Sequence, residues 1–479
     1  MRAILLLLLG AAFIAGTAHA QSFQAGAAAW DTLVPPVFSH LTPADGLPYP
    51  VALGLTQDHK GFIWAATPGG IARWDGYRMT VFRHDDQNPG SLPENIVTSA
   101  MSDEDGRPWF STASGIILRY EESLQGFIAY RNPHEAVGRP NGMVSDGKGG
   151  ILVAGLSGLF HLDVATDTWR RDTRLPDGEV GSVMVDAAGT VWTGTAAGLM
   201  RRPAGAATFE AVAMPRTPKG CIPSALYQAT DGAVWFGTRC GHVGTVADDG
   251  RAALLEAALP PSGHRVTGIA EPRPGHYWVA EYGGGIRELN RRSGAVRQMK
   301  QEPKNATSIG DNSVTSLLID RSGLVWASSL RGIHRHIPNN PHIMTIVPDE
   351  QSGVPGADVR SVAATATGKV WLGFRSEGLV LVDPRASQIN LNPSSRWPEN
   401  LPKRSVQAIA DTADGRVWVG QTGGLSEIDV ASGRVTPFPP LAAENILALL
   451  HDGAALWAGG SMGLARIPLD GSPTRLYRS

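Results

Sequence analysis

The sequence predicts an all-β fold, a β-propeller of four-stranded blades, on three observations. A phrase made of a turn, an apolar residue, a Trp, a small pair and a second Gly-containing turn occurs in ten copies. Anchor positions in successive copies lie 39 to 48 residues apart, which is the period of a propeller blade. Gly (57) and Pro (34) make up about a fifth of the chain, as frequent turns require.

The anchor residue of the phrase is Trp in nine copies and Leu in the third. In chain order the anchors are Trp64, Trp109, Leu152, Trp192, Trp235, Trp278, Trp326, Trp371, Trp418 and Trp457. In the first copy, apolar alternation and turn residues predict strands at 51–57, 62–67, 70–75 and 78–84. The Trp on the second strand is expected to lie between neighbouring blades, so that the blades bury it only by closing into a ring.

Residues 1–20 have the features of a secretory signal: Arg2, an apolar run over 4–15, and small residues at Ala18 and Ala20. A flexible segment is expected at 21–36. No Cys follows the cleavage site and no later apolar run is long enough to span a bilayer, so we expect a soluble, periplasmic chain. Loss of Arg2 changes the net charge from −2 to −3, which argues against a nucleic-acid partner.

The two cysteines, Cys221 and Cys240, both belong to the fifth copy. Cys221 lies in the loop entering the first strand and Cys240 in the loop leaving the second. In an antiparallel blade these loops emerge on the same face, and an even number of Cys in an exported protein favours pairing. A disulfide is predicted, and two separate buried thiols are the alternative.

The sequence offers few candidates for chemistry. The turn Asp of each copy, such as Asp58 or Asp320, is expected to cap its turn, since one carboxylate falls short of the ligands that calcium takes. His334 and His336 are expected to face outward from a third strand, a metal site being the less favoured alternative. No nucleophile elbow or zinc motif is present in the sequence, so we predict no catalytic residue, no metal site and no cofactor.

Sequence differences between the copies are largest in the loops between the second and third strands and between the fourth strand and the next blade. Binding residues concentrate on loops held by a rigid scaffold, so this face is the candidate ligand surface. Its proposed ligand-binding residues are Arg239, Glu281, Tyr282, Arg331, Arg375 and Glu377. Tyr282 offers a stacking face for a sugar and the arginines offer forked donors, whereas ordinary solvated side chains are the alternative.

The repeat resembles the two-component regulator propeller repeat. The resemblance is carried by the phrases DHKGFIWAATPGGIARWDG and DRSGLVWASSLRGI and by the preceding segments SLPENIVTSAMSDEDG and SIGDNSVTSLLIDRSG. The resemblance covers about 37–479. It implies a periplasmic sensor of small molecules or oligosaccharides in a two-component or diguanylate cyclase receptor. Members of that family continue into a linker domain, a membrane helix and a kinase or cyclase, so a membrane-bound signalling partner is also implied.

The chain departs from this family in carrying ten copies, whereas such receptors usually carry two seven-bladed rings. We therefore expect a seven-bladed propeller at 37–348 and three blades of a second at 349–479, in a receptor truncated before its membrane and output regions. One ten-bladed ring is the alternative. A stand-alone enzyme is the second functional class, since GAVWFGT at 232–238 resembles streptogramin lyases, although no matched His/Glu pair is apparent.

Overall fold

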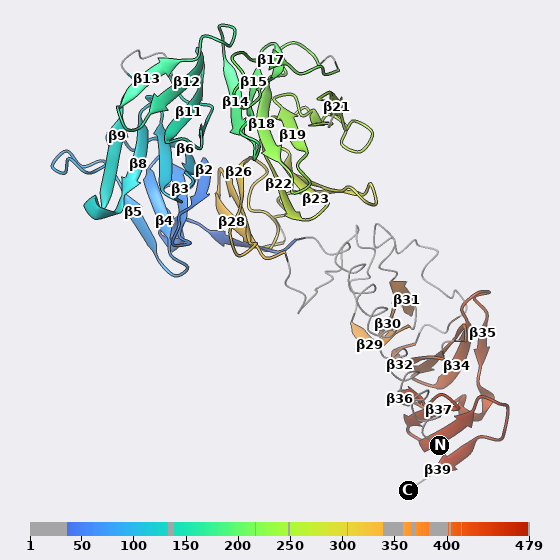
Figure 1. The fold of residues 1–479 in the computed structure, drawn as a ribbon. Coiled ribbons are helices and arrows are strands. Elements are labelled where there is room, and N and C mark those ends of the chain that lie inside the picture. The colour runs from blue at the N-terminus through green and yellow to red at the C-terminus, as the bar shows by residue number, and fades with distance from the viewer. Residues whose placement is uncertain are drawn as a thin grey trace, which may run out of the picture. The chain divides into compact units, whose positions relative to one another are not determined.

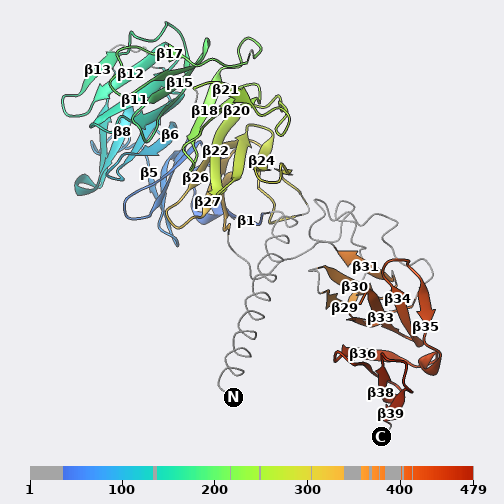
Figure 2. The ribbon, with the colours of Figure 1, turned by 45° about the vertical axis from the view of Figure 1, so that its right-hand side comes forward.

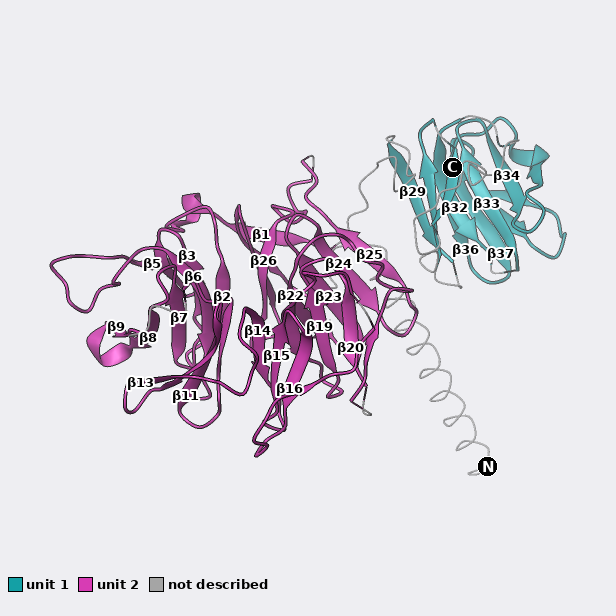
Figure 3. Cartoon of the chain, turned by 90° about the horizontal axis from the view of Figure 1, so that it is seen from above, with its two compact units in different colours: residues 1–35, 341–479 teal, residues 36–340 magenta. Residues whose placement is uncertain are grey.

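The computed structural model describes residues 36–132, 138–215, 217–247, 250–303, 305–338, 358–365, 369–376, 378–382, 401, 404–412 and 414–477. They belong to two compact units, one within 36–340 and one within 341–479 (Figure 3). The expected signal at 1–20 and almost all of 21–36 lie outside the described residues. Within the described ranges the regular structure is β-strand and short 3-10 helix, and no helix there could cross a membrane.

The unit at 36–340, drawn in magenta as unit 2 in Figure 3 and here called the first unit because it comes first in the chain, contains seven antiparallel sheets, here called blades one to seven (Figure 1). Blade one comprises β2 (Gly54–Gln57), β3 (Ile63–Thr67), β4 (Gly70–Trp74) and β5 (Met79–Phe82). Blade two comprises β6 (Val97–Ser102), β7 (Pro108–Thr112), β8 (Ile117–Glu121) and β9 (Gly126–Tyr130). Blade three comprises β10 (Gly142–Ser145), β11 (Gly150–Gly155), β12 (Gly158–Asp163) and β13 (Thr168–Arg171).

The remaining blades of this unit repeat the same strand order. Blade four comprises β14 (Val180–Val185), β15 (Val191–Thr195), β16 (Gly198–Arg202) and β17 (Glu210–Ala211). Blade five comprises β18 (Pro223–Gln228), β19 (Val234–Thr238), β20 (Val243–Val246) and β21 (Ala252–Leu254). Blade six comprises β22 (Val266–Arg273), β23 (His276–Glu281), β24 (Gly285–Asn290) and β25 (Val296–Met299).

Blade seven takes its fourth strand from the other end of the unit. It orders β26 (Val314–Ile319), β27 (Val325–Ser329) and β28 (Gly332–His336) beside β1 (Phe38–Leu41), with Phe38 opposite His336 (Figure 2). The innermost strands contact one another in the order β2, β6, β10, β14, β18, β22, β26, and β26 contacts β2 again. The ring is therefore closed with seven blades.

The second unit holds three consecutive blades, here called eight to ten. Blade eight shows β29 (Val359–Ala364), β30 (Val370–Phe374) and β31 (Leu379–Val382). Blade nine comprises β32 (Val406–Asp411), β33 (Arg416–Gln421), β34 (Gly424–Asp429) and β35 (Val435–Pro437). Blade ten comprises β36 (Ile446–His451), β37 (Ala455–Gly460), β38 (Gly463–Pro468) and β39 (Arg475–Tyr477). The predicted propeller, with seven blades in a ring followed by three more, is confirmed.

The anchor tryptophans occupy the interfaces between blades. Trp64 packs with Phe110 and Phe127 of blade two, Trp235 stacks on Tyr277 of blade six with 4.0 Å between ring centroids, and Trp326 packs on Ile63 and Ala65 of blade one. A single four-stranded sheet cannot bury its own apolar side chains. The Trp ring supplies much of the missing apolar contact when it packs against the next blade. Each interface thus consists of one blade's anchor and the next blade's inner strands.

In five blades the turn Asp preceding the anchor holds both its own turn and the indole. Asp58 accepts hydrogen bonds from the backbone amides of Lys60 and Phe62 and from the Trp64 indole Nε1–H at 2.8 Å. Gly61 adopts φ 94° at the same turn, a conformation that L-residues rarely adopt. The same indole-to-Asp bond recurs at Trp109, Trp192, Trp326 and Trp457. The predicted capping role of these carboxylates matches these contacts.

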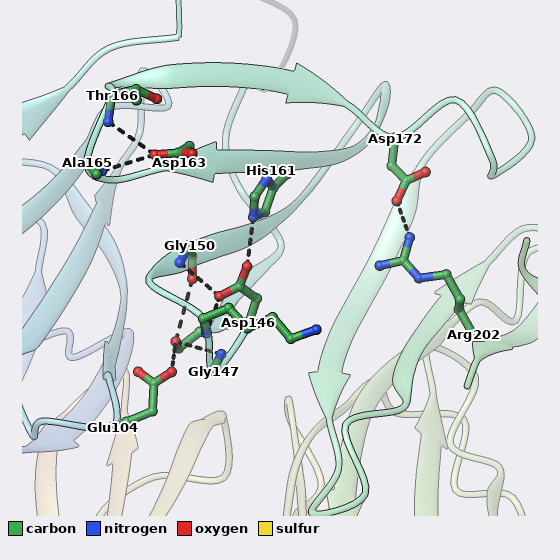
Figure 4. A network of polar contacts seen from close by, with 12 residues as sticks. Glu104, Asp146, Gly147, Gly150, His161, Asp163, Ala165, Thr166, Asp172 and Arg202 are labelled. Carbon is green, nitrogen blue, oxygen red and sulfur yellow. Dashed lines mark hydrogen bonds and ion pairs between the residues drawn. The ribbon is translucent and has the colours of Figure 1, made fainter. Parts of the chain in front are cut away.

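Blade three uses a histidine where five other blades use the anchor tryptophan as the partner of the turn carboxylate. With Leu152 at the anchor position, the turn carboxylate of Asp146 lacks an indole donor and instead contacts Nε2 of His161 at 2.8 Å (Figure 4). His161 lies directly opposite Leu152 in the strand pairing, so its ring reaches the site that Trp would fill. This substitution explains how the third copy keeps the turn without its Trp.

Hydroxyl groups join successive innermost strands. Ser182 donates to the carbonyl of Pro223 at 2.9 Å, Ser224 to Val266 at 2.7 Å, Thr267 to Val314 at 2.8 Å and Thr315 to Ala52 at 2.6 Å. In the second unit Ser361 donates to Val406 at 3.3 Å. Each bond satisfies a carbonyl near the centre of the propeller, where the strands crowd together. Four of them cross consecutive interfaces of the ring, including the one that closes it.

Candidate functional site

The predicted ligand surface corresponds to one face of the first ring, here called the loop face, on which the loops entering each innermost strand and leaving each second strand emerge. Arg239, Tyr282 and Arg331 lie there on blades five, six and seven, each close after a second strand. Tyr282 is about half exposed, and its amide donates to the carbonyl of Arg265 at 2.9 Å. Arg331 is largely exposed, with Nε 3.6 Å from Asp311.

Glu281 does not reach this surface, and the expectation that it does is wrong. Strand β23 runs through Glu281, so the alternation of side chains places it on the same side as Tyr277 and Val279. The side chain is fully buried, and its Oε1 lies 2.6 Å from Nη2 of Arg287. Glu281 occupies the position at which five of the other six blades of the ring carry Thr or Ser, such as Thr67 or Thr238, and blade three carries Gly155. Its buried contact with Arg287 gives it a structural role.

The two predicted residues of blade eight do not belong to the first ring. Arg375 belongs to the second unit, where its guanidinium lies 3.7 Å from the carboxylate of Asp358. Glu377 lies outside the described residues. The candidate surface of the first ring therefore retains Arg239, Tyr282 and Arg331 from the predicted set.

A disulfide and a buried ion pair hold the loop that carries Arg239. Cys221 and Cys240 are joined, with their Cα atoms 5.2 Å apart, and tie the loop entering β18 to the loop leaving β19. From blade six, Arg287 donates to the carbonyls of Gly241 at 3.3 Å and Pro260 at 2.7 Å. Arg239 thus projects from a loop fixed on both sides, which lowers the conformational entropy that ligand binding would have to remove.

Arg239 forms a network with residues of the two preceding blades. Its Nη1 donates to Oε2 of Glu179 at 3.0 Å, and Nη2 contacts the other carboxylate oxygen. The side-chain amide of Asn141 donates to Glu179 at 3.0 Å and to the carbonyl of Val180 at 2.9 Å. The hydrogen bonds from Arg239 lower the pKa of Glu179, partly offset by burial, so this carboxylate is ionised at neutral pH.

Two further arginines of the same face were missed from the sequence. Arg265 immediately precedes β22, and Arg139 lies two residues before Asn141. Desolvation, followed by the charges of Arg239 and Arg139, lowers the pKa of Arg265, although the residue as a whole is exposed. The sequence signal for them is the residue just before each innermost strand, which is Asn141, Glu179 and Arg265 in blades three, four and six. The sequence prediction was based on the longer loops instead.

The histidines considered as metal ligands have other partners. His334 is buried: its Nδ1 lies 2.8 Å from Nδ1 of His40 on β1, and its Nε2 lies 2.8 Å from Oγ of Ser329. His336 is also buried and contacts the carbonyl of Val37 at 3.0 Å. The expectation that both face outward is wrong, because the His334 ring packs on His40 and the His336 ring stacks on Trp278 of blade six. In the described part of the chain, no group of three or more potential ligand residues gathers around a metal-sized site.

Comparisons with known proteins show the fold. No family model and no curated protein matches the chain. The extracellular domain of the putative hybrid two component system BT3049 from B. thetaiotaomicron is 19% identical with a TM-score of 0.70, over 93% of this chain and 60% of that one. The corresponding BT4673 domain of that organism is 16% identical, with a TM-score of 0.55 and the same coverage. The chain spans about three fifths of these structures.

A second group of similar structures consists of lyases. Virginiamycin B lyase from Staphylococcus aureus is 16% identical with a TM-score of 0.51, over 62% of this chain and 98% of the lyase. The similarity to the sensor domains therefore extends over both units of the chain, whereas the similarity to the lyase corresponds in extent to a single ring.

Proposed function

We propose that this chain is the ligand-binding part of an exported signal-transduction receptor, of the two-component or diguanylate cyclase type. The observation that carries the proposal is the similarity over 93% of the chain to an extracellular domain of a putative hybrid two component system. Because the identity is 19%, this likeness concerns the fold, and the function is argued from the site.

The proposed ligand is a small molecule or oligosaccharide bound at the loop face of the first ring. Three features support this placement: the fixed loop of Arg239, the half-exposed ring of Tyr282 and the exposed guanidinium of Arg331. An aromatic face beside forked donors is the combination that sugars and organic acids bind. Signalling output would belong to a membrane-bound partner or to sequence outside this chain, in the periplasmic arrangement expected for such receptors.

A binding screen tests the proposal. Thermal shift of the chain against a library of neutral and acidic oligosaccharides and organic acids should identify a ligand, and calorimetry should then give its affinity. The double variant Tyr282→Ala/Arg331→Ala should abolish binding with little change in melting temperature, since both side chains are exposed. Unchanged affinity in this variant would move the site away from the loop face, and absence of binding to every library member would remove the proposal.

The enzyme alternative has weaker support from the site. The pair His161–Asp146 serves the turn of blade three, and the pair His276–Glu288, at 3.3 Å, lies at the turn end of β23. The pair His242–Glu256, also at 3.3 Å, lies on the loop face, but it joins two neighbouring loops of blade five at the edge of that blade. A propeller lyase needs an acid and a base that converge on one substrate. We therefore favour binding over catalysis for this chain.

A further inference from the structure

We propose that the ligand of the first ring is an acidic one, whose carboxylate or sulfate group is held by Arg139, Arg239 and Arg265, here called the rim arginines. The inference rests on the proposed sensor function and deepens it by assigning the chemical class of the ligand. It also assigns two binding residues, Arg139 and Arg265.

Backbone placement brings the rim arginines together. Arg265 immediately precedes β22 and Arg239 immediately follows β19, at the same end of neighbouring blades, and Ser224 fixes these blades by donating to the carbonyl of Val266 at 2.7 Å. Arg139 lies two residues before Asn141, whose side chain reaches Glu179 and Val180 of blade four. Arg139, Arg239 and Arg265 therefore lie at the same end of blades three, five and six, and the Arg239 guanidinium and the Asn141 amide meet on Glu179.

The positive charge of this cluster is only partly compensated by Glu179. Glu179 is the carboxylate of the network, and it is already engaged by Arg239 and Asn141. Among the described residues, neither Arg139 nor Arg265 forms an ion pair or a side-chain hydrogen bond. Three positive charges against one negative charge leave a net excess of about two, on a chain whose overall charge is negative.

Mutual repulsion supports the placement. Desolvation, followed by the charges of Arg239 and Arg139, lowers the pKa of Arg265, and the charge of Glu179 partly offsets this shift. Unpaired guanidinium groups that repel one another are relieved when an anion binds between them, because each offers two parallel donors to carboxylate or sulfate oxygens. The repulsion present in the free protein favours binding of such a ligand.

Tyr282 indicates that the anion is carried by a sugar. Its amide is hydrogen-bonded to the carbonyl of Arg265, which places its half-exposed ring next to the rim arginines. A ring that stacks on a pyranose and arginines that bind its acidic substituent would together select a uronic acid or a sulfated saccharide. A non-sugar polycarboxylate would use the arginines alone.

Calorimetry on the full chain separates these sources. The probes are an oligogalacturonate, a sulfated disaccharide, citrate, and a neutral galacto-oligosaccharide of matched length, all at one ionic strength. We expect the acidic saccharides to bind, citrate to bind more weakly, and Arg139→Gln/Arg265→Gln to weaken acidic binding by roughly 10-fold or more, as loss of charge-assisted hydrogen bonds implies. These two arginines are chosen because their replacement leaves Glu179 paired.

The control variant is Arg291→Gln, an exposed arginine at the opposite end of blade six that lies 3.3 Å from Asp231. It should leave the affinity for acidic saccharides unchanged. Binding of the neutral probe alone, or acidic binding that survives the double Gln variant, would overturn the inference while leaving the sensor proposal in place. Absence of binding to all acidic probes would also overturn it, and the neutral members of the wider screen would then decide the sensor proposal separately.

Discussion

The seventh and tenth blades contain the same phrase but bury it differently. In blade seven the Trp326 indole bonds to Asp320 at 2.8 Å and its ring packs beneath blade one, leaving 3% of the residue exposed. In blade ten the Trp457 indole bonds to Asp452 at 2.7 Å, but its ring lines a hollow with Leu450 and Leu464, which are 64% and 42% exposed. The repeated sequence therefore determines the fold of a blade, whereas burial of its anchor Trp also requires a neighbouring blade that packs over the ring.

The largest expected effect tests this difference directly. Replacing Trp235, which is fully buried against Tyr277, by Ala should cost roughly 3–5 kcal/mol of unfolding free energy, the range for a truncated buried aromatic. Replacing Trp457 by Ala should cost about 1 kcal/mol or less, because its ring is only partly buried and no blade among the described residues packs over it. Urea unfolding of the two variants gives both values, and equal losses would contradict the contrast between closed and uncovered interfaces.

The disulfide of blade five should contribute the next largest effect, and it belongs to the closed ring alone. Cys221 and Cys240 are 19 residues apart, and a loop of this size contributes about 3 kcal/mol by restricting the unfolded chain. Cys221→Ser/Cys240→Ser should lower the stability of the ring by that order without altering the second unit. Thiol titration of the unfolded, unreduced protein should find no free sulfhydryl group, and two reactive groups would disprove the bond.

Ring closure by β1 should depend on pH. Burial, with the charge of His40, lowers the pKa of His334 from its ordinary 6.5 to about 3, so the unfolded chain takes up this proton before the folded chain does. The contribution is fully present above pH 6.5 and is lost as the pH falls toward 3. At pH 5 the loss should be about 2 kcal/mol by linkage. His334→Asn should flatten the pH dependence of unfolding, and an unchanged profile would exclude His334 as its source.

The smallest expected change in stability concerns the hydrogen bond that the Thr315 hydroxyl makes between blade seven and blade one. Thr315 donates to the carbonyl of Ala52 at 2.6 Å, and Thr315→Val keeps the shape while removing the donor. We expect a loss of about 1 kcal/mol, the usual net value of a buried hydrogen bond. Thr80→Val, on an exposed position of the outer strand β5, is the matched control and should change stability by much less. Losses of equal size would show that the bond at Ala52 adds nothing to closure.

Much of this fold could be predicted because the same turn and anchor pattern occurs many times in the sequence. Ten copies of one turn chemistry indicated the blades, and the role of Asp58 or Asp320 followed from the side chain alone. Two features could not be read in this way. The pairing of Phe38 with His336 joins residues nearly 300 positions apart, and the exchange of a Trp–Asp contact for His161–Asp146 depends on a residue of the third strand rather than on the phrase itself.

The candidate site was less predictable, for a reason visible at Glu281 and Arg265. A loop was assumed to begin at Glu281, but β23 includes this residue, and a shift of one position reverses the direction of a side chain in a strand. Aligning the copies on their anchors would have placed Glu281 with Thr67 and Thr238. Arg265 was missed because the convergence of side chains over a rim depends on three-dimensional closure, which no local pattern records.

Closure by β1 also has a consequence for the order of folding. During synthesis β1 emerges some 294 residues before the strand it pairs with, which at ~5–20 residues per second is a delay of roughly 15–60 s. Throughout this time six blades can form from local hairpins, while the last interface waits on a contact of very high sequence separation, the slowest kind to find. Phe38 remains available to wrong partners during the whole delay, and the edge of β28 from its own synthesis until it pairs with β1. The nascent chain is therefore most prone to aggregate just before β1 pairs with β28 and the ring closes.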